Sequence, residues 1–182
     1  PLAAGSYSFK VADADWTTPI FGAGADGNSV TLGAGKTLAS PGDNLNVVIP
    51  NTATYVFTLD ANNKEVPVLT VQELPPYGVG TTVYLRGALS WDPVDAMAYV
   101  GANIYQVDLV LNEVKQYTFK FADASWGTVN YGAEAGAMTL NTAKTLEHNK
   151  GDLSLNVTEV GSYRFSVDAS TPEAPVMTIT KL

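Results

Sequence analysis

The chain has 182 residues, of which 15% are charged, and its formal net charge is −8 at pH 7. Nucleic acids and anionic membranes attract clusters of Lys and Arg, so this charge argues against both partners and favours an uncharged or basic one. With no cysteine and a single histidine, disulfides, thiolate nucleophiles and metal sites made of Cys or several His are excluded.

A repeat organises the sequence. Residues 7–16 return almost unchanged as residues 117–126, at a spacing of 110 residues. A repeat of that length exceeds the units of solenoid proteins, so it predicts tandem domains. We predict one module over residues 1–74 and a second over residues 75–182. Because the chain begins with Pro rather than Met, we also expect it to be a processed or excised piece of a longer protein.

The first module is expected to contain short strands separated by turns. Polar and apolar residues alternate in residues 6–12, which predicts a strand with one face in the core. A loop with Trp16 and Phe21 follows, and residues 60–64 read as a hairpin connection. The remaining strands of this module are predicted at residues 30–32, 45–48, 54–59 and 68–72.

The second module is expected to be more complete. Residues 73–80 contain consecutive prolines and are predicted to be a linker. Two strands at residues 82–89 and 104–111 have no counterpart in the first module. The other strands are predicted at residues 117–122, 138–140, 153–157, 162–167 and 176–180.

This pattern predicts an all-β fold with two tandem immunoglobulin-like antiparallel β-sandwiches. The first module has five predicted strands against seven in the second, because it lacks the two opening strands. It is therefore either completed by upstream residues of the parent protein or left with open sheet edges. Such edges could exchange strands with another chain or form a dimer.

The sequence predicts no set of residues that could catalyse a reaction. The pairs Asp13 with Asp15 and Asp92 with Asp95 stand in turns, where Asp caps backbone N–H groups. His148 lies in a polar run and reads as a solvated turn residue. The turn at residues 26–28 could hold calcium, but its spacing falls short of a known calcium loop. We therefore predict a protein that is not an enzyme and has no cofactor and no metal site.

Tryptophans are the strongest candidate binding residues. Trp126 follows a predicted strand whose Tyr117, Phe119 and Phe121 point inward, while Lys120 points outward. Trp91 lies in a separate loop, so the two indoles could form a flat apolar platform that stacks on sugar rings, with Lys120 donating to hydroxyl groups. The alternative is that the tryptophans belong to the core, as they often do in β-sandwiches.

The second module also resembles a known family. Residues 83–87, Trp91, residues 104–105, 117–126 and 130–132 together are similar to the X25-type starch-binding and accessory modules of bacterial pullulanases and other amylolytic enzymes. Those modules are in turn similar to the glycan-binding domains of SusE and SusF. The resemblance implies a noncatalytic β-sandwich that binds α-glucan. By position it implies the binding residues Trp91, Trp126, Lys120 and Tyr131, and in the first module Lys10, Trp16 and Phe21.

We therefore expect noncatalytic binding of a neutral polysaccharide, most simply an α-glucan, by a secreted or bacterial cell-surface protein. No apolar run approaches the ~20 residues that span a bilayer, so no membrane insertion is expected. The alternative function is a structural spacer or cell-surface interaction module with no small-molecule ligand. Exposure of Trp91 and Trp126 separates the two, because a platform must face solvent.

Overall fold

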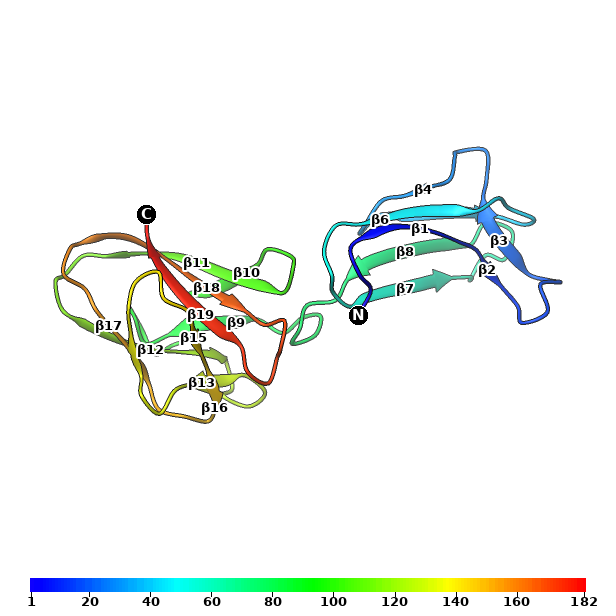
Figure 1. The fold of residues 1–182 in the computed structure, drawn as a ribbon. Helices are drawn as coiled ribbons and strands as arrows, with labels where there is room; N and C mark the ends of the chain where they lie inside the picture. Colours follow the sequence, from blue (N-terminus) through cyan, green and yellow to red (C-terminus); the bar gives the residue numbers. More distant parts are fainter. The chain divides into compact units, whose positions relative to one another are not determined.

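The computed structural model describes residues 1–182 and confirms the all-β prediction (Figure 1). The chain divides into two compact units, unit 1 (Pro1–Leu74) and unit 2 (Pro75–Leu182), and each is described by itself below. The structure contains no helix long and apolar enough to cross a membrane.

Unit 1 consists of two small sheets around one core. One sheet has the strand order β1-β6-β4 and the other the order β2-β3-β5-β8-β7. Figure 1 shows β7 beside β8 at the end of the larger sheet. The strands are β1 (Gly5–Phe9), β2 (Val11–Ala12), β3 (Ile20–Ala23), β4 (Ser29–Val30), β5 (Gly35–Ala39), β6 (Leu45–Ile49), β7 (Tyr55–Asp60) and β8 (Val68–Glu73).

Unit 2 is a sandwich whose two layers join through one strand. Its ladder runs β14-β17-β12-β9-β10-β11-β18-β19-β15, and β13 pairs with both β12 and β16. The first half of β10 pairs with β9 and the second half with β11. The strands are β9 (Val83–Arg86), β10 (Ala96–Tyr99), β11 (Ile104–Leu111), β12 (Gln116–Asp123), β13 (Asn130–Gly132), β14 (Ala137–Met138), β15 (Lys144–Thr145), β16 (Glu147–His148), β17 (Leu153–Asn156), β18 (Gly161–Asp168) and β19 (Val176–Lys181).

The core of unit 2 follows the alternation of its strands. Tyr117, Phe119 and Phe121 of β12 are buried, as predicted, and Phe119 packs edge-on against Phe165 of β18 at 5.3 Å.

In both units, tyrosine hydroxyls connect the start of a strand to the loop before it. Each hydroxyl donates to a backbone carbonyl four residues earlier. Such bonds satisfy a polar tip at the edge of an apolar core. They are made by Tyr7, Tyr55, Tyr117 and Tyr163.

The two units share one strand plan. Phe57 of β7 lies opposite Val71 of β8, just as Phe165 of β18 lies opposite Ile179 of β19. Both units also place a parallel pair at the same point, β4 with β6 and β14 with β17. Strands β9 to β11 have no counterpart in unit 1, so unit 1 lacks its opening strands.

Some predicted elements were wrong. Three opening strands are missing from unit 1, not two, because the connection between the predicted strands at residues 82–89 and 104–111 contains a third strand, β10. Unit 1 has eight strands rather than five, because the predicted strand at residues 6–12 divides into β1 and β2 and because β3 and β5, which are short, were not predicted. Residues 73–80 are not a free linker, because Tyr77 packs on the core of unit 2 and its hydroxyl donates to Pro172 O at 3.2 Å.

Candidate functional site

The indole rings of Trp91 and Trp126 lie next to each other on unit 2. Their centroids are 6.1 Å apart and their planes are inclined by 37°. Trp91 is 43% exposed and Trp126 is partly exposed. Trp91 belongs to the β9–β10 connection and Trp126 to the β12–β13 connection, so two separate loops bring the rings together. The pair forms a bent apolar surface rather than a flat one.

Arg86 holds both loops in place. Its guanidinium carbon lies 4.0 Å from the centroid of the Trp126 ring. Its Nε donates to Trp91 O at 2.7 Å, Nη2 donates to the same oxygen, and Nη1 donates to Asp123 O at 3.1 Å and Ala124 O at 3.0 Å. Arg86 is only 6% exposed. The planar fork of an arginine can make these bonds and stack on an indole at once, which a lysine cannot.

The turn before Trp126 is built around the carboxylate of Asp123. Asp123 Oδ1 accepts from Ser125 N, Ser125 Oγ and Gly127 N, and Oδ2 accepts from Thr128 N and from Val129 N at 2.9 Å. These bonds close the turn and place Trp126 in the left-handed region, at φ 60°. The sequence predicted this capping role for Asp in turns, although not how many N–H groups one carboxylate would serve.

The same carboxylate makes unit 2 sensitive to acid. Burial raises the pKa of Asp123, but the hydrogen bonds from Val129, Ser125 and Gly127 outweigh it and lower the pKa from 3.8 to about 2. A lowered native pKa stabilises the fold above the unfolded pKa, and this contribution is lost as pH falls from about 4 to about 2. We expect unit 2 to lose about 2 kcal/mol of stability over that range.

Urea unfolding at pH 7, 4 and 2, followed by NMR signals of unit 2, measures this loss. Asp123→Asn should be less stable at pH 7. Its free energy of unfolding should also fall less than that of the wild type as the pH is lowered, because it has no carboxylate to protonate at this position. Asp152→Asn, at an exposed carboxylate of the same unit, is the matched control and should decline like the wild type. An unchanged pH dependence in Asp123→Asn would show that another group is responsible.

Gly87 lets Trp91 lie close to the backbone. A Cβ at position 87 would meet two atoms of the Trp91 ring at 2.7 and 2.8 Å and Thr118 O at 2.6 Å. Gly87 also has φ +107°, which side chains rarely adopt. The indole of Trp91 therefore lies directly over the backbone at Gly87, just after β9, and a side chain at position 87 would displace it.

Lys120 completes the surface. It lies opposite Arg86 in the β12–β9 ladder, and its Nζ is 5.9 Å from the centroid of the Trp126 ring. Lys120 is partly exposed, whereas Arg86 is buried. The two cations thus differ in what they can do: Arg86 positions the tryptophans, and Lys120 offers N–H donors to solvent or to a ligand.

Other candidate residues lie elsewhere. Tyr131 is 5% exposed and packs in the core with Tyr77 and Phe121, on the face of β12 opposite to Lys120. Phe21, its counterpart in unit 1, is 8% exposed and belongs to that unit's core. Neither ring is part of a surface platform, because alternation along the sheet turns both inward. We therefore leave both out of the site.

Unit 1 presents a single tryptophan. Trp16 is 62% exposed and has φ 56°, close to that of Trp126. The carboxylate of Asp13 accepts from Thr17 N, Thr17 Oγ1 and Thr18 N, which repeats the turn around Asp123. Lys10 is partly exposed. No residue of unit 1 stands where Trp91 and Arg86 stand, since both come with the β9–β10 segment.

The carboxylates considered for catalysis do not form a catalytic pair: Asp13 caps a turn, and Asp95 has an oxygen without a hydrogen-bond partner. The hydrogen bonds of Thr17 lower the pKa of Asp13, and burial raises the pKa of Asp95, whose Oδ2 has no hydrogen-bond partner. Asp26, considered for calcium, pairs with Lys36 at 2.8 Å. No group of three or more His, Cys, Asp and Glu side chains could hold a metal ion.

Comparison with known proteins shows a partial likeness to a solved structure. No family model matches the chain, and no curated protein matches it. Among solved structures the chain is similar to one described as "Ligand induced structure of AmyP-SBD", a starch-binding domain. The two share 26% identity over 57% of this chain and 73% of that one, with a TM-score of 0.42. At that score the likeness decides neither the fold nor the function of this chain.

Proposed function

We propose that unit 2 binds a neutral polysaccharide, without catalysis, through the adjoining faces of Trp91 and Trp126. The observation that carries this proposal is the pair itself, two neighbouring indoles from separate loops, partly open to solvent and held from beneath by one buried arginine. Indole faces stack on the C–H faces of sugar rings, because both surfaces are flat and apolar. A buried tryptophan pair, as in a purely structural module, would offer no such face.

An α-glucan suits this surface better than a flat β-linked chain. The ring planes are inclined by 37°, and α-1,4 linkages turn successive glucose rings relative to one another. One ring stacked on each indole would follow that bend, and Lys120 Nζ could donate to a hydroxyl at the side of Trp126. In this proposal the chain serves a secreted or surface protein that acts on starch-like polysaccharide.

Two aromatic platforms that bind the same glycan chain raise the affinity for that glycan. A shallow, wet surface with one stacked ring must offset the ordering of the ligand with little contact area. When two rings of the same chain stack together, the second contact is effectively intramolecular. Unit 1 has Trp16 alone, so we propose that binding resides in unit 2.

Affinity electrophoresis of the full chain tests the function. Gels containing amylopectin or pullulan should retard the protein, while gels containing cellulose derivatives or xylan should not. The retardation should change little with salt, because stacking depends little on screened charge. Equal mobility in all gels would refute the proposal and favour a spacer or interaction module.

A further inference from the structure

Unit 2 has a cavity beside the turn that carries Trp126. Its volume is about 400 Å³, within the range of about 300–1,000 Å³ that is usual for small-molecule sites. We call it the Tyr84 cavity, because Tyr84 is the aromatic residue in its lining. The lining residues are Gly80, Thr81, Thr82, Tyr84, Asp123, Ala124, Ser125 and Thr128.

The Tyr84 cavity continues the row of aromatic side chains along β9. Trp91 lies over Gly87, and the ring of Trp126 lies against the guanidinium of Arg86. Tyr84 points to the same side of the sheet as Arg86, because the two residues are two positions apart in one strand. Positions 84 and 87 are about 10 Å apart along an extended chain, a length that a short oligosaccharide spans. A glycan that follows the row from Trp91 over Trp126 therefore meets the Tyr84 cavity next.

The ring of Tyr84 is open to a ligand. Tyr84 is partly exposed and contacts no other aromatic ring of the chain. Its partner across the ladder is Ala122, which has only a methyl group to place beside the ring. A phenol ring offers a flat apolar face and a hydroxyl group at its tip. Tyr84 can therefore stack on a sugar ring as an indole does.

Hydroxyl groups surround this ring. Thr81, Thr82, Ser125 and Thr128 line the cavity. Of these four, only Ser125 uses its hydroxyl within the protein, since it donates to Asp123 Oδ1 at 2.8 Å. The three threonine hydroxyls are left to donate and accept, and a sugar hydroxyl can use both functions.

The Tyr84 cavity has no unpaired charge. Asp123 is the only charged residue in its lining, and both of its carboxylate oxygens already accept hydrogen bonds within the turn. No Lys, Arg or His side chain lines the cavity, so it has no cation to pair with an anion. The ligand that fits this lining is neutral and rich in hydroxyl groups.

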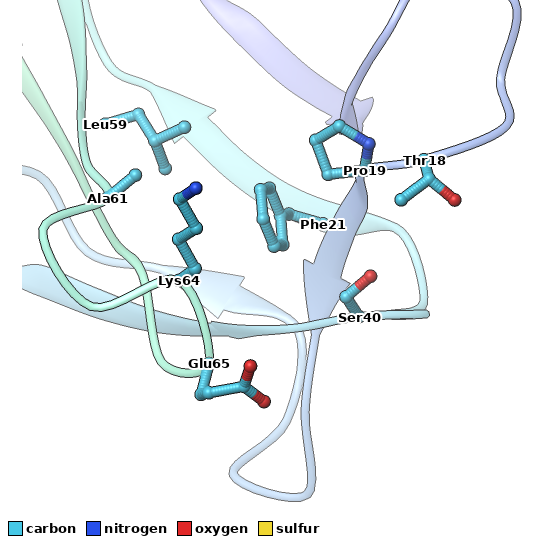
Figure 2. Close-up of a pocket in the computed structure, with 8 residues that line it drawn as sticks. All are labelled: Thr18, Pro19, Phe21, Ser40, Leu59, Ala61, Lys64 and Glu65. Carbon is cyan, nitrogen blue, oxygen red and sulfur yellow. The ribbon is translucent and has the colours of Figure 1, made fainter.

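A cavity in unit 1 has a different lining. Its volume is about 610 Å³, and Figure 2 shows Phe21 in the middle of it, between Leu59 and Pro19. These three side chains are apolar. Unit 1 has no counterpart of β9, so it has no residue at the position of Tyr84. A row of three aromatic residues that ends in a polar cavity is therefore a feature of unit 2.

We propose that the Tyr84 cavity is a third subsite for the same glycan, in which Tyr84 stacks on a sugar ring and Thr82 and Thr128 bond to its hydroxyls. This proposal rests on the proposed function, since the tryptophan pair must bind the glycan first. Two sugar rings occupy the indoles, and the cavity takes a ring further along. The subsite selects for chain length: a disaccharide ends at the indoles, whereas a longer glycan makes the additional contacts intramolecularly.

NMR titration of the full chain with maltose and with maltoheptaose tests this subsite. In the wild type, both sugars should shift the indole signals of Trp91 and Trp126. Only maltoheptaose should shift the amide signals of Thr81 and Thr82, because maltose is too short to enter the cavity while it covers both indoles.

Variants test which side chains form the subsite. Tyr84→Ser should reduce the ratio of maltoheptaose affinity to maltose affinity at least fivefold. Thr128→Val should reduce this ratio at least twofold, and it alters an exposed residue outside the strands, so the fold should remain. Thr180→Val, the same change at an exposed threonine of β19, is the matched control and should leave the ratio unchanged.

The outcomes separate this proposal from the proposed function. A wild type that binds neither sugar would overturn both. An unchanged affinity ratio in Tyr84→Ser, or equal shifts of Thr82 with maltose and maltoheptaose, would overturn the third subsite and leave the tryptophan pair in place. If Tyr84→Ser does not fold, the wild-type shifts and Thr128→Val decide the question.

Discussion

Trp126→Ala is expected to abolish retention of the chain in amylopectin gels. The substitution removes one of the two stacking faces and leaves Trp91 alone, so we expect a loss of about 2 kcal/mol of binding free energy, or roughly thirtyfold in affinity. The fold should remain, because Trp126 is partly exposed and its turn is held by Asp123. The ring loses its contacts with Arg86 and Trp91, at a cost of about 1 kcal/mol in the stability of unit 2.

Trp126→Tyr is the matched control, since it keeps a flat aromatic face at the same position. It should retain a large part of the affinity. Thermal unfolding of both variants measures the effect on stability. A collapse of unit 2 in Trp126→Ala would assign the ring to the core, and undiminished retention would remove it from the site.

Arg86→Ala is expected to have the largest effect on stability. The guanidinium serves three backbone carbonyls, those of Trp91, Asp123 and Ala124, and supports the Trp126 ring. Its removal leaves buried acceptors without donors and empties the space between two loops. We expect unit 2 to lose about 3 kcal/mol or more. Glucan binding should fail as well, because both tryptophans lose their support.

Hydrogen exchange resolved along the chain measures this effect in each unit separately. Protection should fall in β9 and β12 and remain in unit 1. Arg86→Lys keeps the charge but not the fork, so it should recover little of the stability. Lys120→Ala, at the neighbouring partly exposed cation, should leave protection nearly unchanged. Equal protection from hydrogen exchange in Arg86→Ala and the wild type would show that the two loops keep their conformation without Arg86.

The sequence predicted the long strands because their alternation is strong. The expected strand at residues 104–111 coincides with β11, and the expected strand at residues 117–122 lies within β12. The short strands β13, β15 and β16 were missed, since two or three residues carry no period. Their pairing depends on partners far away in the chain, which a local pattern cannot reveal.

The site was only partly predictable. The repeat and the break in alternation pointed to Trp126, and a second loop pointed to Trp91. Arg86 was missed, although it stands in the string at residues 83–87 on which the family resemblance rests. On a strand an arginine reads as a solvated residue, and only its position opposite Lys120, beneath Trp126, shows that it is buried. Tyr131 was named only because the family resemblance implied it, and its place opposite Phe121 in the ladder turns it into the core.

Calorimetric titration of the full chain with maltoheptaose tests the proposed site most directly. We predict one binding site per chain, unchanged in Trp16→Ala and lost in Trp91→Ala, and no heat with cellohexaose. Trp16→Ala and Trp91→Ala remove the same side chain from an exposed loop of each unit, so they are matched to each other. Two equal sites per chain, or full binding in Trp91→Ala, would contradict a site formed by the tryptophan pair of unit 2.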